Sequence, residues 1–193
     1  MKADGVQLAT AVIGGAVGAV LTQLATFFRD WLGKHEEGQF TGLTLALALE
    51  AYAWECTEPH FTFTNYVSSN QATAAPSGRL PTLPEFSEKT NWRSIGVKAA
   101  SDVLGFRVKV NTAQGSLRDT WEFEGKVSAW SDADDIGIEL GAAALTVARS
   151  LRSKFRLGPM SRGEHFDLEE FYTEQMAKLE RQKAARETAD DGL

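Results

Sequence analysis

The chain is poor in cysteine and histidine, the residues that most often build disulfides and metal sites. Cys56 is the only cysteine among 193 residues, so no disulfide can form within one chain. A single thiol also fits a reducing compartment. There are three histidines, His35, His60 and His165, whereas a structural zinc site needs about four ligands, usually in paired motifs. The sequence therefore predicts no metal site and no cofactor.

Basic side chains are outnumbered by acidic ones. The chain has 20 Lys and Arg against 26 Asp and Glu, which gives a net charge of −6. Because phosphate binding needs a basic patch, we expect no nucleic acid partner. Apolar residues make up 43% of the chain and charged residues 24%, as is typical of a globular domain. The length leaves room for one membrane anchor and one domain of about 150 residues.

Charged side chains are absent from residues 5–28, between Asp4 and Arg29. A helix of this length rises about 36 Å, and a hydrocarbon core is about 30 Å thick. We therefore predict an N-terminal transmembrane anchor over residues 1–32 of a single-pass membrane protein. Two alternatives stay open. One is a signal peptide, although Lys2 is the only basic residue before the run and no small-x-small cleavage site is obvious. The other is a buried or interfacial helix.

The basic residues that flank residues 5–28 are too few to fix the orientation firmly. Lys2 precedes the run, and Arg29 and Lys34 follow it. A four-residue N-terminal tail is easy to translocate, and the free cysteine fits the cytosol. We therefore expect the C-terminal domain to lie in the cytoplasm.

Small residues recur at every fourth position of the predicted span. Lipid supplies no hydrophobic drive between helices, so small side chains that allow close backbone approach favour their association. One interpretation is a helix–helix interface, with homo-oligomers as the expected state. The other is that glycine and alanine are common in spans and the spacing arose by chance. The candidate interface residues are Thr10, Ala11, Gly14, Gly15, Gly18, Ala19 and Thr22.

Beyond the anchor the pattern predicts an all-α domain, a helical bundle over residues 33–160 with a charged helix or tail over 161–193. The first bundle helix, over 39–58, is apolar almost all round, so we expect it to be central. Four of the five prolines lie in 59–91, which predicts a long loop. The tail predicts a surface helix that frays near Thr188.

Two further helices have visible start and stop signals. Asn91 is a candidate N-cap for a helix whose apolar stripe runs from Trp92 to Trp121, with a break or kink at Gly105. Residues 106–111 also alternate locally like a strand. Ser131 is a candidate N-cap for the next helix, and Gly158 is its expected end. Its expected core face contains Ile138, Gly141, Leu145, Ala148 and Phe155.

Three side chains are candidates for chemistry. Glu50 and Glu139 interrupt apolar helix faces and could do acid–base work if desolvated. More often such carboxylates pair with a cation, for which Arg107, Lys109 and Arg118 are candidates. Cys56 is predicted to be a small buried thiol rather than a nucleophile or a ligand beside His60. We therefore expect no catalytic residues.

Three segments carry a resemblance: residues 80–95, residues 121–124 (Trp-Glu-Phe-Glu) and residues 141–155. Together they resemble small uncharacterised bacterial proteins that pair one N-terminal span with a helical domain. The similarity covers roughly residues 40–158. It implies an all-helical domain and a bacterial or phage setting, hence the bacterial inner membrane for the anchor. It implies no activity and no site residues.

These observations predict a membrane-anchored, non-catalytic helical interaction module whose partners are the lipid bilayer, other copies of the chain and an unknown protein. The alternative is an effector of a bacterial conflict or phage system that oligomerises through the span and permeabilises a membrane. An enzyme that uses Glu50 and Glu139 has the weakest support.

Overall fold

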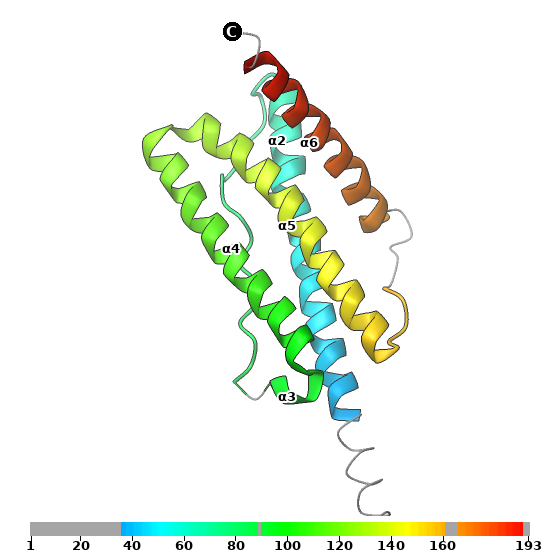
Figure 1. Ribbon diagram of the computed structural model, residues 1–193. Coiled ribbons are helices and arrows are strands. Elements are labelled where there is room, and N and C mark those ends of the chain that lie inside the picture. Colours follow the sequence, from blue (N-terminus) through cyan, green and yellow to red (C-terminus); the bar gives the residue numbers. More distant parts are fainter. Residues whose placement is uncertain (1–35, 89, 161–165, 191–193) are drawn as a thin grey trace, which may run out of the picture.

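The computed structural model describes residues 36–88, 90–160 and 166–190, and within them every regular element is a helix (Figure 1). The all-α prediction and the helical bundle are therefore confirmed. The elements follow one another as a helix over 36–55, α2 (Thr57–Ser68), α3 (Trp92–Ile95), α4 (Val97–Phe123), α5 (Lys126–Phe155) and α6 (Leu168–Asp190). Among these described helices, none has the length and apolar character needed to cross a membrane. The predicted anchor and its small-residue stripe lie outside the described residues.

The first helix ends sooner than predicted, and the long loop begins later. Cys56 forms a turn between the 36–55 helix and α2, so residues 57–68 are helical rather than part of a loop. Pro59 sits in the first turn of α2, where a missing N–H costs little because the first four N–H groups of a helix lack partners. The two helices together form one long rod with a break at Cys56.

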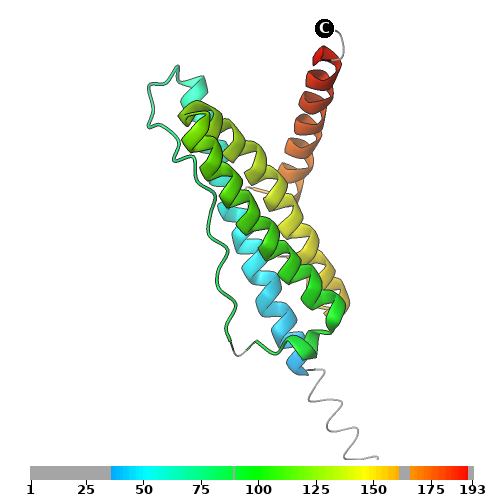
Figure 2. The same ribbon diagram turned by 60° about the vertical axis from the view of Figure 1, so that its left-hand side comes forward.

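Residues 69–88 then run back along the bundle, and we call them the strap (Figure 2). The strap is long because it links the far end of α2 to α3 at the opposite end of the bundle. It is tied down by the buried side chains of Leu80 and Leu83 and by a hydrogen bond from Gln114 Nε2 to the Pro81 carbonyl at 3.2 Å. Phe86 packs edge-on against Trp92, with ring centroids 5.7 Å apart. Parts of the strap therefore pack on the domain.

Asn91 caps a helix as predicted, but the helix it caps is short. Its side chain accepts a hydrogen bond from the Ser94 backbone N–H at 3.3 Å. The chain then turns at Gly96, whose φ of 76° favours glycine, and α4 starts afresh at Val97. Gly105 lies inside α4, which continues unbroken through it, so the predicted break and the local strand alternative are wrong. The predicted apolar face is confirmed between Ile95 and Leu117, because Ile95, Ala99, Val103, Phe106, Val110 and Leu117 are buried, whereas Trp121 is 38% exposed.

The longest described helix, α5, starts and ends at other residues than predicted. It begins at Lys126, after a turn at Gly125 with φ 98°, and Ser131 lies inside it. It ends at Phe155, where Arg156 rather than Gly158 takes the left-handed conformation. The expected core face is confirmed, since all five of its residues are buried. α5 packs on α2, α4 and α6 and is central to the bundle. The first helix also lies centrally, because it contacts α4 through Tyr52, α5 through Glu50 and α6 through Ala53.

Glycines on α5 allow this close packing. A Cβ at Gly137 would lie 3.3 Å from the Cys56 carbonyl oxygen, and a Cβ at Gly141 would overlap the Tyr172 ring. Tyr172 belongs to α6, and its hydroxyl donates a hydrogen bond to the Ala53 carbonyl at 2.6 Å. Beyond Leu179, the described side chains of α6 are exposed up to Arg186, and the helix leans away from the bundle (Figure 2).

Candidate functional site: an apolar stripe beside an arginine cleft

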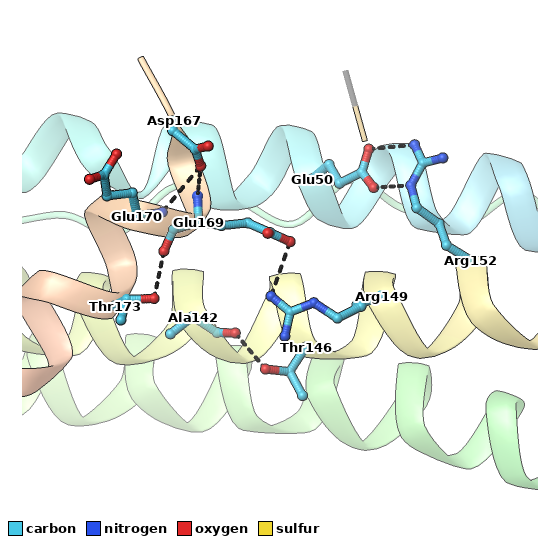
Figure 3. A network of polar contacts seen from close by, with 9 residues as sticks. All are labelled: Glu50, Ala142, Thr146, Arg149, Arg152, Asp167, Glu169, Glu170 and Thr173. Atoms are coloured by element: carbon cyan, nitrogen blue, oxygen red, sulfur yellow. Dashed lines mark hydrogen bonds and ion pairs between the residues drawn. The ribbon is translucent and has the colours of Figure 1, made fainter. Parts of the chain in front are cut away.

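Both candidate carboxylates are ion-paired, but with partners that the sequence did not identify. Glu50 accepts two hydrogen bonds from Arg152 of α5, at 2.5 Å from Nε and 2.9 Å from Nη2 (Figure 3). Glu139 pairs with Lys183 of α6. The candidates on α4 were therefore wrong. Hydrogen bonding to Glu50 raises the pKa of Arg152, and hydrogen bonding to Glu139 raises that of Lys183. Each carboxylate is thus held by a cationic side chain of another helix, which suits a structural pair better than a proton-transfer group.

The Glu50–Arg152 pair lies in a cleft of about 420 Å³ between the ends of several helices. Arg152 also donates from Nη1 to the Gly158 carbonyl at 2.5 Å. Arg149, one turn earlier on α5, pairs with Glu169 of α6 at 3.0 Å (Figure 3). Asp167 caps α6 by accepting from the backbone N–H groups of Glu169 and Glu170 at 2.9 and 3.2 Å. The two arginines of α5 in this cleft are thus bound by carboxylates of the first helix and of α6, which links the three helices.

His60 contacts Asp134 of α5, and Cys56 is buried in the core. His60 Nδ1 lies 2.8 Å from Asp134 Oδ1 of α5, and the His60 ring packs against Phe61 and Phe171. Among the described residues, no group of three metal-binding side chains occurs. Cys56 is 1% exposed, and burial raises the pKa of its thiol to about 12. A thiol with that pKa is almost wholly protonated at neutral pH, so it is a poor nucleophile.

The strap borders a second cleft, of about 360 Å³, between the strap, α2 and α5. Its lining includes Glu55 and Glu58, Arg79 of the strap and Trp130 of α5. Gly78 lets the strap approach both α4 and α5, because a Cβ there would lie 2.7 Å from the Trp121 ring of α4 and 3.0 Å from the Trp130 ring of α5. This cleft contains both acidic and basic side chains. Its described residues do not indicate one kind of ligand or reaction.

A row of exposed apolar side chains runs along the first helix and α2. Other exposed apolar side chains lie on α4 and at the start of α5, among them Val97, Val108, Phe123 and Val127. Phe40 is 73% exposed, Leu47 51%, Trp54 53% and Phe61 44%. They are spaced by seven residues, so they share one face of the rod. We call these four residues the apolar stripe. Phe166, just before α6, covers part of its C-terminal half through edge contacts with Trp54 at 5.2 Å and Phe61 at 6.0 Å.

The apolar stripe lies between two packed faces of the same helix. On one side, Gln39 Nε2 donates to the Phe155 carbonyl at 3.3 Å and Glu50 binds Arg152, so this side faces α5. On the other side, Thr41 accepts a hydrogen bond from Ser94 at 3.5 Å and Tyr52 packs edge-on against Phe106, so that side faces α3 and α4. The stripe therefore points out of the bundle.

Sequence reasoning missed this stripe, because it placed Leu47 and Trp54 among the core residues of an all-round apolar helix. The opposite set, Leu45, Leu49, Tyr52 and Cys56, is the buried face. The signal that could have found the stripe is the seven-residue spacing of its four large apolar residues. The predicted interface of Thr10, Ala11, Gly14, Gly15, Gly18, Ala19 and Thr22 lies outside the described residues.

Comparison with known proteins gives no relative: no protein-family model, no curated protein and no solved structure matches the chain. The resemblance to small bacterial membrane proteins therefore stays a prediction.

Proposed function

We propose that the chain is a single-pass membrane protein whose helical domain is a non-catalytic interaction module, with the apolar stripe as its binding surface. The observation that carries the proposal is the position of the stripe. It begins at Phe40, twelve residues after the uncharged run of residues 5–28 ends. A partner bound there would be held close to the bilayer, where the predicted anchor places the domain.

The exposure of the stripe supports a binding role. Single exposed apolar residues are ordinary on protein surfaces, but a contiguous patch of several hundred Å² marks an interaction site. Two of the four stripe residues are Phe and one is Trp. Trp is enriched among the residues that dominate the energetics of protein interfaces. The aromatic side chains present large area at low conformational entropy, which favours binding.

The polar groups of the described residues support the non-catalytic part of the proposal. Glu50 and Glu139 have cationic partners, and Cys56 is buried with a raised pKa. Acid–base or nucleophilic catalysis needs a group whose proton is available near neutral pH and whose position reaches a substrate. The pairs with Arg152 and Lys183 instead hold α5 and α6 in place.

Site-specific photocrosslinking in membranes tests the proposal. A photoreactive residue in place of Thr44, which lies on the stripe face and is exposed, should give a protein adduct. The matched control is the same residue in place of Ser101, which is exposed on α4 away from the stripe, and it should give none. Adducts with lipid alone, or equal adducts at both positions, would contradict the proposal.

A second variant tests the anchor. Val17→Arg places a charge in the middle of the predicted span, where it costs about 2.5–3.5 kcal/mol on insertion scales. We expect it to release the protein from the membrane fraction and to abolish the Thr44 adduct. A domain that forms the same adduct after release needs no anchor, and the membrane part of the proposal would be wrong.

A further inference from the structure

We infer that the partner of the apolar stripe is a second copy of this chain, bound in parallel so that the two 36–55 helices pair side by side. The inference rests on the proposed function, because the predicted span would hold two copies with their N-termini at one membrane surface. It goes beyond that function by naming the partner and its orientation.

The spacing of the exposed residues favours pairing of two helices. On the stripe face the exposed residues follow one another at steps of four and three: Phe40, Thr44, Leu47, Ala51 and Trp54. Alternating steps of three and four are the seam of a two-stranded coiled coil, in which each side chain enters a space between residues of the partner helix. Large side chains alternate here with the small Thr44 and Ala51. This alternation lets two such seams interlock.

Charges along the two edges of the stripe differ in sign. The edge toward α5 carries Arg152 and Arg149, which are paired with Glu50 and Glu169. Arg156 lies in the same cleft and gives this edge a net positive charge. The edge toward α3 and α4 carries Glu37 and Glu55 of the helix itself, which lie on one face because they are eighteen residues, or five helical turns, apart. Arg156, Glu37 and Glu55 are exposed. One edge is therefore basic and the other acidic.

This charge pattern selects the parallel arrangement. In a parallel pair related by a twofold axis, the basic edge of one helix faces the acidic edge of the other, and the contact occurs twice. In an antiparallel pair, basic edge would face basic edge and acidic would face acidic, which costs free energy. A parallel pair is also the arrangement that a shared N-terminal anchor requires.

The area of the stripe suits a dimer that is helped by the membrane. A large aromatic side chain buries about 150–250 Å² when fully covered, so half-exposed ones contribute roughly 100 Å² each. Four such residues on each copy give roughly 800 Å² for the pair, below the roughly 1,000 Å² typical of a stable interface. Polar edges add area, and tethering of both copies to one bilayer raises their effective concentration.

Disulfide crosslinking of the full-length chain in membranes tests the inference. We would make Thr44→Cys and Ala51→Cys separately, oxidise each, and look for covalent dimers on a non-reducing gel. In a parallel pair, equal positions meet, so each variant should crosslink with itself. Ser101→Cys on α4 is the matched control, and the unaltered chain, whose Cys56 is buried, is the second control. Neither control should form a dimer.

Three outcomes would overturn the inference. If no single variant crosslinks, no second copy occupies the stripe. If a dimer forms only when Thr44→Cys and Ala51→Cys chains are mixed, the pair is antiparallel. If Ser101→Cys crosslinks equally well, the contacts are random collisions. A protein adduct in the photocrosslinking experiment, together with no disulfide dimer here, would leave the proposed function standing and remove only this inference.

Charge reversal tests the pairing of edges separately from the seam. Glu37→Lys and Arg156→Glu, each added to Thr44→Cys, place like charges on opposing edges. Each should lower the yield of crosslinked dimer by about fivefold, because exposed ion pairs contribute up to about 1 kcal/mol. The two reversals combined should restore most of the yield. A combined variant as weak as the single ones would contradict parallel pairing through these edges.

Discussion

Arg152 of α5 binds both carboxylate oxygens of Glu50, a residue on the opposite wall of the same cleft and 102 positions earlier in the chain. The Glu50 and Arg152 side chains are only 11% and 13% exposed. Removal of one partner from such a pair leaves an uncompensated charge in a poorly solvated place. We predict that Glu50→Gln lowers the free energy of unfolding by about 2–3 kcal/mol, measured by urea denaturation of the detergent-solubilised chain.

The neighbouring pair of Arg149 and Glu169 provides the control for this measurement. Its side chains are 63% and 40% exposed, so solvent screens the interaction. Glu169→Gln should change the free energy of unfolding by less than about 1 kcal/mol. If Glu169→Gln destabilises as much as Glu50→Gln, the difference in burial does not decide the strength of these pairs.

Gly141 sets how closely α6 can approach α5, because a Cβ at that position would overlap the Tyr172 ring. Gly141→Ala should lower the free energy of unfolding by about 2–3 kcal/mol, since the ring must move and its hydrogen bond to the Ala53 carbonyl is lost. Gly105→Ala is the control, because nothing lies within 4 Å of a Cβ there. It should stabilise by about 0.5–1 kcal/mol, as is usual for alanine in place of glycine inside a helix. Thermal unfolding followed by circular dichroism measures both, and a gain at position 141 would contradict the close packing.

Local periodicity predicted most of the bundle, because a helix that buries one face has apolar residues at regular intervals in its sequence. The buried apolar face of α3 and α4 and the core face of α5 were both predicted from apolar residues at steps of three and four. Helix starts were less predictable. Ser131 and the acidic residues after it form a good cap signal, yet α5 begins at Lys126, because Ala129 is buried and Trp130 packs against Tyr66 of α2. Tertiary packing overrode the local signal.

The candidate site could be predicted only in part, for a similar reason. The sequence identified Glu50 as an unusual carboxylate, but its partner depends on where α5 lies, which no local pattern records. The same limit applied to the apolar stripe. An apolar helix predicts burial on every side, and only the arrangement of α2, α4 and α5 leaves Phe40 and Leu47 outside. To predict that Phe40 and Leu47 are exposed, one must know which helices pack against each side of the first helix.

Asp135 should make stability depend on pH in an unusual direction. Burial, and then the nearby Asp134, raises the pKa of Asp135 above its ordinary value of 3.8. The unfolded chain therefore ionises this group more readily than the folded one, so ionised Asp135 opposes folding at neutral pH. This penalty fades as pH falls through the raised pKa and is gone below about 3.8. Asp135→Asn should be more stable than the unaltered chain at pH 7 and equal to it at pH 3, measured by urea denaturation. An equal gain at both pH values would show that the charge of Asp135 is not the cause.

Cys56 should be nearly inert while the chain is folded. Burial raises its pKa from 9.0 to about 12, so the thiolate fraction at pH 8 falls by about a thousandfold. Labelling with iodoacetamide at pH 8 should therefore be very slow in the native protein and fast in guanidinium chloride, where the thiol is exposed. Thr44→Cys supplies the comparison, because position 44 is exposed and its thiol should react in the folded state. Rapid labelling of native Cys56 would mean that the region around the turn between the first helix and α2 opens often. In that case the helix that carries the apolar stripe would not be rigid. The unaltered chain, with its reactive Cys56, would also no longer serve as a control that forms no disulfide dimer.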